Sequence, residues 1–345
     1  MSRHVATCLF AAVALGCAAR PPDGVTESGS VQSRNDPEAS YPRVVGYRTP
    51  ESTGVQLWYE RFGGPGRPSV VLLNGGDSQA IFWPLEFIVE LLDASYDVVR
   101  FDARDAGLSE WLPFPPGFEP RSWTPEVPPP YGLDAHVADL FGLLDALEVP
   151  RAHLIGISQG AMVAQLAALA EPERVLSLTL LSTSPSNPYD DSLGAVDPEL
   201  LGYLKEQFPR VGRAASLPWP FGGSRVVGLQ TDLLAAIAGL SPDDRAALRD
   251  YVQESYERAG VNGASSQGFA VASAGSRLTE LARVRVPTLV VHGSEDRFIR
   301  PAHAVALANA IEGARLILVP GGHGFPFRMF ERQTGAILEN LARGE

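Results

Sequence analysis

The chain has 345 residues, 45% of them hydrophobic, so it is long enough for one large domain or two small ones with a sizeable buried core. Its 28 basic and 40 acidic side chains give a formal charge of -12. Such an acidic balance repels phosphate backbones and anionic lipid surfaces, and no basic patch interleaved with aromatic residues is evident. The composition therefore argues against nucleic-acid binding and disfavours anionic substrates.

The first 17 residues, MSRHVATCLFAAVALGC, have a short basic start followed by small and apolar residues. This pattern is typical of a secretory signal peptide, and it is too short to span a membrane as a stable helix. Its end, Ala14 to Cys17, resembles the lipobox of bacterial lipoproteins, with Ala14 where leucine is usual. We therefore expect an exported protein that is lipid-anchored to the cell envelope through Cys17. The alternative is cleavage near Ala19 and a soluble periplasmic or secreted product.

Residues 18–40 are rich in Pro, Gly, Ser and charged residues without periodic apolar positions, which predicts a disordered linker. From residue 41 onward, strand-like apolar stretches alternate with helix patterns. We expect strands at 44–47, 55–61, 69–74, 97–102, 152–157, 177–182, 288–292 and 315–319. We expect helices at 83–92, 132–147, 159–170, 301–311 and about 330–342. The alternation predicts an α/β domain over 41–345 whose mostly parallel, eight-stranded sheet is flanked by helices.

The alternation breaks over about residues 183–276, where Pro, Gly and aromatic residues separate several helical patterns, including 242–258. Because strands resume at 288, this segment is predicted to be a helical insertion that splits the α/β domain.

The sequence Gly156-Ile157-Ser158-Gln159-Gly160 lies where a buried strand meets a helix. A G-x-S-x-G in this context is the signature of a nucleophile elbow, a turn so sharp that side chains at the flanking positions would collide with neighbouring backbone. The following helix also directs its N-terminal N–H groups at the serine. We predict that Ser158 is a nucleophile.

A serine hydroxyl needs a base to take its proton, and the base needs a third group to fix its tautomer. Of the six histidines, His323 lies in VPGGHGFPF just beyond the strand at 315–319, in a glycine-rich loop able to reach the carboxyl ends of the strands. The others read as structural, surface or signal-peptide residues; His292, beside Gly293 at a strand end, is expected to pack or bond locally. His323 is the predicted base.

For the acid, HGSEDRF places Asp296 four residues past the end of the strand at 288–292. Glu295 is the nearest rival, and Asp190 and Asp191 are weaker ones. With Asp296 as the acid, the order along the chain is Ser, Asp, His, the order expected for this elbow motif.

An oxyanion formed by the attack requires two hydrogen-bond donors. One is expected to be the backbone N–H of Gln159, the residue after the nucleophile. The other is expected from Gly76 in Asn74-Gly75-Gly76-Asp77, because two glycines after a strand let the backbone approach a substrate closely. A plain glycine turn is the alternative interpretation of this loop.

Four motifs together resemble the α/β-hydrolase superfamily over residues 41–345: the elbow, HGSEDRF, GGHGF, and FDARDAGLS at 101–109. The last looks like the D-x-R-G-x-G-x-S loop of that superfamily, with Asp105 in place of its first glycine. That departure and NGGDSQAIFWP at 74–84 are similar to the aclacinomycin methylesterase-like serine hydrolases. In this resemblance Asn74 stands where histidine is common, and Gln159 where methionine is often found.

The resemblance implies the α/β-hydrolase fold, with Ser158, Asp296 and His323 as the triad and Gly76 and Gln159 as the oxyanion donors. It also makes the insertion at about 183–276 a helical cap. We therefore expect a serine hydrolase that cleaves a small-molecule carboxylic ester through an acyl-enzyme. No metal or cofactor is expected, because no His, Cys or carboxylate cluster has ligand spacing.

The aromatic residues of the cap and nearby loops suggest an apolar or aromatic substrate, although they could equally be cap core; they are Trp123, Phe208, Trp219 and Phe221. Two alternatives stay open. One is an amidase, peptidase or perhydrolase with the same triad, and the other is an envelope-tethered binding module of this fold that does not turn over. Membrane contact is expected only through the N-terminal anchor.

Overall fold

The computed structural model describes residues 23–36, 38–120, 123–124, 127–215, 223–240, 242–260, 266–324 and 326–345. The predicted signal peptide with Cys17 lies outside these residues. So do Trp219 and Phe221, two of the aromatic residues to which the sequence analysis pointed.

The described residues form a sheet of nine strands in the order β1-β2-β3-β5-β4-β6-β7-β8-β9. The neighbours β1/β2, β2/β3 and β3/β5 are antiparallel, and the other neighbouring pairs are parallel. The bounds are β1 Gly24–Gln32, β2 Ser40–Arg48, β3 Leu57–Phe62, β4 Ser69–Leu73, β5 Asp97–Phe101, β6 Ala152–Ile157, β7 Val175–Leu181, β8 Thr288–Gly293 and β9 Arg315–Val319.

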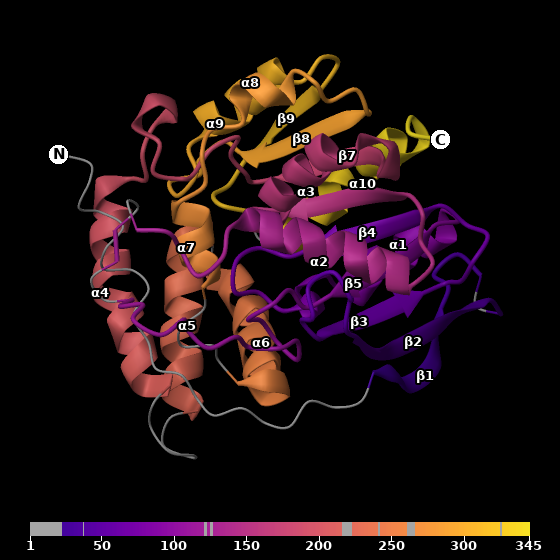
Figure 1. The fold of residues 1–345 in the computed structure, drawn as a ribbon, viewed down its shortest axis with the longest axis horizontal. Coiled ribbons are helices and arrows are strands. Elements are labelled where there is room, and N and C mark those ends of the chain that lie inside the picture. Colours follow the sequence, from indigo (N-terminus) through magenta and orange to yellow (C-terminus); the bar gives the residue numbers. More distant parts are fainter. Residues whose placement is uncertain are drawn as a thin grey trace.

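Helices cover both faces of this sheet (Figure 1). The α-helices are α1 Leu85–Asp93, α2 Leu133–Ala146, α3 Gln159–Ala170, α4 Pro198–Ala215, α5 Gly223–Ala238, α6 Pro242–Ala259, α7 Gln267–Ala272, α8 Leu278–Leu281, α9 Pro301–Ala310 and α10 Pro326–Ala342. Short 3-10 helices lie at η3 Ala80–Phe82, η4 Pro172–Arg174 and η5 Asp191–Leu193. The fold is therefore the mostly parallel α/β sheet flanked by helices that the sequence predicts.

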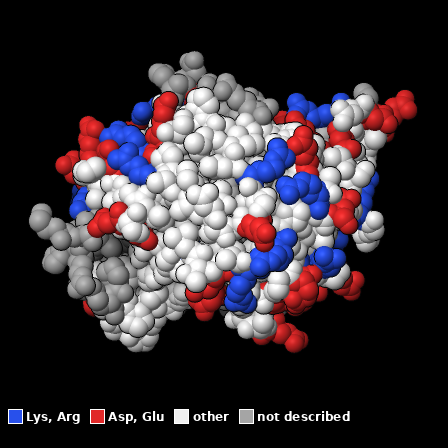
Figure 2. Space-filling model, turned by 90° about the horizontal axis from the view of Figure 1, so that it is seen from above, with Lys and Arg blue, Asp and Glu red and all other residues white. Residues whose placement is uncertain are grey.

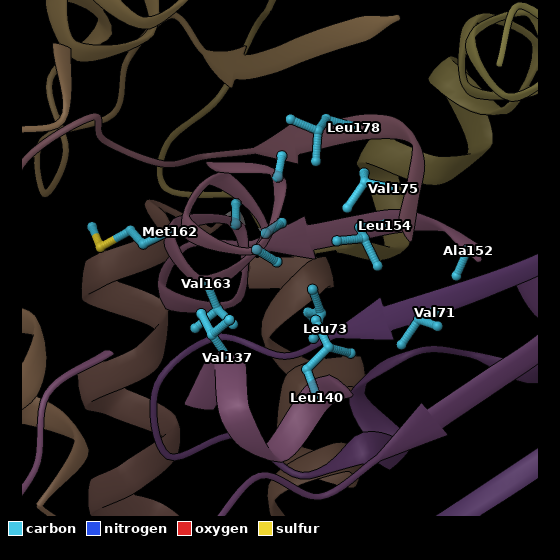
Figure 3. Packing of buried hydrophobic residues seen from close by; sticks show 14 of the residues in the cluster. Val71, Leu73, Val137, Leu140, Ala152, Leu154, Met162, Val163, Val175 and Leu178 are labelled. Atoms are coloured by element: carbon cyan, nitrogen blue, oxygen red, sulfur yellow. The ribbon is translucent and has the colours of Figure 1, made fainter. Parts of the chain in front are cut away.

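Alternate residues of β4 explain why its sequence is apolar throughout. Val71 and Leu73 pack in a cluster with side chains of α2 and α3 (Figure 3), whereas Val70 and Leu72 pack in a second cluster with side chains of α1 and α10. Successive side chains of a strand point to opposite faces, so a strand buried on both faces needs apolar residues at every position. All five residues of β4 are buried.

Strand β1 corrects two predictions, since residues 24–32 belong to the sheet rather than to a disordered linker, and the sheet has nine strands rather than eight. β1 pairs with β2 in an antiparallel register from Gly24 opposite Tyr47 to Gln32 opposite Ser40. Its side chains are exposed at most positions. Backbone hydrogen bonds to β2 hold this strand in the sheet. Because its side chains are exposed on both faces, its sequence carries no hydrophobic pattern that would predict a strand.

The segment in which the sequence predicts an inserted cap contains α4, α5, α6 and α7. Figure 1 shows α4, α5 and α6 side by side on the left, at the side of the sheet to which the arrow of β8 points. The end of α5 contacts the loop after β9 directly: a Cβ added to Gly322 would lie 2.4 Å from the carbonyl oxygen of Ala238. The helical insertion therefore lies over the carboxyl ends of the parallel strands.

On the face drawn in Figure 2, basic and acidic side chains gather toward the edges, often side by side, around an uncharged centre. No helix in the described part of the chain combines the length and apolarity needed to cross a bilayer.

Candidate active site

Ser158 lies between β6 and α3 in a conformation that few residues adopt, with φ 52° and ψ -116°. The residues two positions before and two positions after Ser158 must be glycines. A Cβ at Gly156 would lie 2.6 Å from the backbone nitrogen of Ala161, and a Cβ at Gly160 would lie 2.3 Å from the carbonyl oxygen of Leu73. These contacts are with backbone atoms, which can move only at a large cost in free energy. The strand, the strained serine and the helix form the sharp turn that the motif predicts.

The loop after β9 carries His323 to this turn. The Nε2 atom of His323 lies 3.2 Å from Ser158 Oγ, and its Nδ1 atom lies 2.8 Å from Asp296 Oδ2. Nδ1–H donates to the carboxylate, which leaves the Nε2 lone pair free to accept the serine proton. The structure thus brings together three side chains that are 165 and 27 residues apart along the chain.

Asp296 is buried and held in place from both carboxylate oxygens. Oδ1 accepts hydrogen bonds from the backbone N–H groups of Phe298 and Ile299, each at 2.8 Å. Burial alone raises the pKa of this carboxyl, but the charge of His323 and hydrogen bonds from His292 and His323 outweigh it and hold the pKa well below its ordinary value. The group is therefore a carboxylate at neutral pH, as an acid partner of the histidine needs to be.

The rival acids lie elsewhere. The side chain of Glu295 is exposed. Asp190 accepts hydrogen bonds from the backbone N–H and the hydroxyl of Ser192, and Asp191 is exposed at the start of η5. The carboxylate hydrogen-bonded to His323 is that of Asp296.

His292 is a contact of the site that the sequence analysis missed. Its Nε2 atom lies 2.8 Å from the carbonyl oxygen of Ile299 and 3.3 Å from Asp296 Oδ2. Nε2–H is therefore shared between this carbonyl and the carboxylate. The sequence predicts that His292 packs or bonds locally, and it does bond to Ile299; its contact with Asp296 was not predicted.

The glycine loop reaches Ser158 through Gly75, and Gly76 lies beside the side chain of Gln159. A Cβ added to Gly75 would lie 3.6 Å from Ser158 Cβ, and one added to Gly76 would lie 2.8 Å from Gln159 Oε1. Gln159 is the first residue of α3, so its backbone N–H is one of those without a partner inside the helix. The glycine loop and the start of α3 thus flank the serine from two sides.

The glycine loop is anchored by Asn74, the residue that stands where histidine is common. Its Nδ2 atom donates to the carbonyl oxygen of Phe101 at 2.9 Å, and its Oδ1 atom accepts from Trp83 Nε1 at 2.7 Å. Asn74 and Trp83 are both buried. An amide can satisfy a donor and an acceptor together, which explains how asparagine serves in this position.

The loop at 101–109 packs beside the site. Asp105 has φ 61°, the left-handed conformation that favours glycine. Its carboxylate compensates by accepting hydrogen bonds from the backbone N–H of Leu112 at 2.5 Å and from the Tyr131 hydroxyl. The replacement of the superfamily glycine by Asp105 therefore ties this loop to the segments that follow it.

The same loop joins the cap through Asp102. Its Oδ2 atom accepts from Arg258 Nη1 of α6 at 2.7 Å, and the guanidinium lies 4.0 Å from the centre of the Trp58 ring. This buried ion pair fixes one end of α6 to the α/β domain.

The predicted aromatic residues that the structure describes are packed in cores. Trp123 is buried against Phe269 of α7, with ring centres 5.0 Å apart, and Phe208 packs in the cluster formed by α4 and α5. Phe298 lies closer to the chemistry, with its ring centre 5.1 Å from that of His323. Within the described residues, no group of three or more His, Cys, Asp or Glu side chains is arranged to hold a metal ion.

Comparisons with known proteins show the family to which the chain belongs. The family described as alpha/beta hydrolase fold matches residues 65–327. Rhodomycin D methylesterase of Streptomyces peucetius is 29% identical over 307 residues, which cover 82% of this chain and 94% of the relative. A 2-hydroxy-6-oxononadienedioate/2-hydroxy-6-oxononatrienedioate hydrolase of Paraburkholderia xenovorans is 28% identical over 312 residues, which cover 88% of this chain and 96% of that relative.

Among solved structures, an enol-lactonase from Burkholderia xenovorans matches with a TM-score of 0.64 at 22% identity, covering 86% of this chain and 99% of that one. At this identity the likeness concerns the fold. The chain belongs to the alpha/beta hydrolase fold family. With its hydrolase relatives, this confirms the predicted fold and the predicted enzyme class, a hydrolase.

Proposed function

We propose that this protein is a serine hydrolase that cleaves a carboxylic ester through an acyl-enzyme. The observation that carries the proposal is the position of His323, whose two ring nitrogens lie 3.2 Å from Ser158 Oγ and 2.8 Å from Asp296 Oδ2. The distance to Ser158 suits proton transfer to the imidazole, and the distance to Asp296 suits the hydrogen bond that fixes its tautomer.

In the first half of the reaction, His323 Nε2 takes the proton of Ser158 as Oγ attacks the ester carbonyl. The tetrahedral intermediate collapses when the imidazolium gives that proton to the leaving alcohol, which departs and leaves the acyl group on Ser158. In the second half, His323 deprotonates a water molecule that attacks the acyl-enzyme. The carboxylic acid is released, and the proton returns to Ser158.

The backbone N–H groups of Gly76 and Gln159 are proposed to bind the oxyanion in both halves. They flank the serine, and the N-terminus of α3 adds the positive end of its dipole. Each such donor is worth about 3 kcal/mol of barrier. Asp296 stabilises the imidazolium formed in between, because its carboxylate is ionised and fixed by two backbone N–H groups.

We propose an uncharged ester with an apolar or ring-containing acyl group as the substrate class. The methylesterase relatives act on rhodomycin D by their names, and the ring of Phe298 beside His323 offers an apolar contact. A small alcohol such as methanol is the leaving group that this relationship favours.

The test is labelling with a fluorophosphonate together with hydrolysis of short-chain aryl esters. We expect Ser158→Ala to abolish labelling and to lower turnover by about a millionfold, whereas the matched control Ser192→Ala, at an exposed serine, leaves both unchanged. Retention of a tenth of the activity by Ser158→Ala would dismiss the assignment. Amide and peracid-forming assays in parallel separate the sister chemistries, and a wild type that neither labels nor hydrolyses supports a binding module.

Cellular location is a separate proposal, supported by residues 1–17 alone. We propose export and lipid anchoring at Cys17. Cys17→Ser is expected to move the protein from the membrane fraction to the soluble fraction, and unchanged fractionation would favour an ordinary signal peptide.

A further inference from the structure

The glycine loop next to Ser158 has a second anchor, which comes from α7, about 190 residues further along the chain. Gln267, the first residue of α7, is 1% exposed. Its Oε1 atom accepts the backbone N–H of Asp77 at 2.9 Å, and its Nε2 atom donates to the carbonyl oxygen of Arg104 at 2.5 Å. One side chain thus bridges the loop at 74–77 and the loop at 101–109.

Asp77 follows Gly76 directly and has φ 57°. Non-glycine residues hold this left-handed conformation only where surrounding contacts impose it, at a cost of about 1 kcal/mol or more. The peptide group that Gln267 binds is the one joining Gly76 to Asp77. The orientation of this peptide group therefore constrains the backbone of Gly76, whose N–H is the proposed oxyanion donor.

The loop at 101–109 is a firm support for this bridge. The Arg104 guanidinium forms two hydrogen bonds with the buried Asp139 carboxylate, at 2.6 and 2.7 Å. The adjacent Asp105 carboxylate accepts a hydrogen bond from the backbone N–H of Ser266, the residue before α7. The start of α7 is thereby fastened to a rigid part of the α/β domain at two neighbouring positions.

We propose that Gln267 is a positioning residue for the oxyanion hole. Only a side chain with both an acceptor and a donor satisfies the Asp77 N–H and the Arg104 carbonyl together, and the amide of Gln267 supplies both. The inference rests on the proposed function, because it assigns to Gln267 the placement of the Gly76 N–H.

The test compares Gln267→Met, which keeps the shape and loses both hydrogen bonds, with Gln267→Glu, which keeps only an acceptor. The matched control is Gln207→Met, because Gln207 is a buried cap glutamine whose Oε1 atom accepts from Arg210 within α4. Three quantities are measured for each variant: kcat and KM for an aryl ester, and the affinity for an aryl boronic acid. The boronic acid adds to the serine and places an oxygen in the oxyanion hole.

We expect kcat of Gln267→Met to fall by about tenfold, less than the roughly hundredfold or more that loss of a whole oxyanion donor causes. Boronic acid affinity should fall by a similar factor while KM changes little, with Gln267→Glu between Met and wild type. Should Gln267→Met not fold, the Glu variant carries the same comparison.

A lowered melting temperature with unchanged kcat and boronate affinity would overturn the inference, because it describes a purely structural glutamine. Equal losses in Gln207→Met would overturn it as well. A wild type that neither hydrolyses esters nor binds the boronic acid would instead overturn the proposed function, so the two failures are distinguishable.

Discussion

The two loops that meet at Ser158 are held in place by different means. The elbow at 156–160 is fixed by close backbone contacts, since a Cβ at Gly156 would meet the backbone of Ala161 and one at Gly160 would meet the backbone of Leu73. The glycine loop at 74–77 is fixed from a distance, through Asn74 bound to Trp83 and through Gln267 of α7. The nucleophile is thus placed by close packing of backbone against backbone, whereas the loop with the proposed oxyanion donor Gly76 is held by hydrogen bonds from side chains.

After the loss expected for Ser158→Ala, the largest effect concerns the acid of the triad. Asp296→Asn should lower kcat by about ten-thousandfold, because an amide in this place favours the wrong tautomer of His323. The matched control is Glu295→Gln, one residue away and exposed, which should leave kcat unchanged. Steady-state kinetics on an aryl ester decides, and near-normal rates for Asp296→Asn would remove Asp296 from the triad.

The next effect tests whether close backbone contacts fix the elbow. Gly160→Ala would bring a methyl group to 2.3 Å from the carbonyl oxygen of Leu73, so we expect a loss of about 3 kcal/mol in the free energy of unfolding together with most of the activity. Gly202→Ala in α4 is the control, because that position opens onto free space. It should be neutral or stabilising by up to about 1 kcal/mol in urea unfolding. A tolerated Gly160→Ala would contradict the steric account.

A smaller effect is expected in the glycine loop. Asn74→Ala leaves the buried Trp83 Nε1–H and the Phe101 carbonyl without their partner, at a cost of about 1–2 kcal/mol in the free energy of unfolding. We expect kcat to fall about tenfold at the same time, since the loop loses one of two anchors. Loss of stability without any change in kcat would show that the loop needs no anchor at this point.

The smallest effect is a dependence of stability on pH. Burial raises the pKa of the Asp105 carboxyl above its ordinary value. The native state then binds a proton more readily than the unfolded chain, so the contribution of this group to stability is greatest below the unfolded pKa of about 3.9 and declines as the pH rises toward the native pKa. Asp105→Asn should remove this decline, measured by urea unfolding between pH 4 and 8. If the free energy of unfolding of Asp105→Asn changed with pH as it does in the wild type, the pH dependence would belong to other groups.

The sequence was sufficient for the parts of the site that obey local rules. A G-x-S-x-G between a buried strand and a helix predicted the elbow, and loops beyond two later strands predicted Asp296 and His323. Parallel strands bring their carboxyl ends to one edge of a sheet, so residues just past those ends meet even when they are far apart in the chain. The mostly parallel sheet followed from the same alternation.

The features that could not be predicted from the sequence depend on contacts that no periodic hydrophobic pattern marks. β1 is exposed on both sides, so no apolar pattern marks it. His292 lies in HGSEDRF, but its contact with Asp296 depends on how that loop folds. Gln267 belongs to no motif, and it reaches Asp77 only through the tertiary fold. The sequence left open whether Trp123 contacts a substrate or belongs to a core, because an aromatic residue in a loop has the same signature in both cases; the structure places it in a core cluster.

The close approach of Gly322 to Ala238 makes the position of His323 depend on the helical insertion. No side chain fits between the loop that carries His323 and the end of α5, so the two backbones support each other directly. A displacement of this end of α5 would remove the surface on which the loop rests. The alignment of the imidazole with Ser158 and Asp296 therefore relies on a helix outside the sheet as well as on the strands that precede these residues.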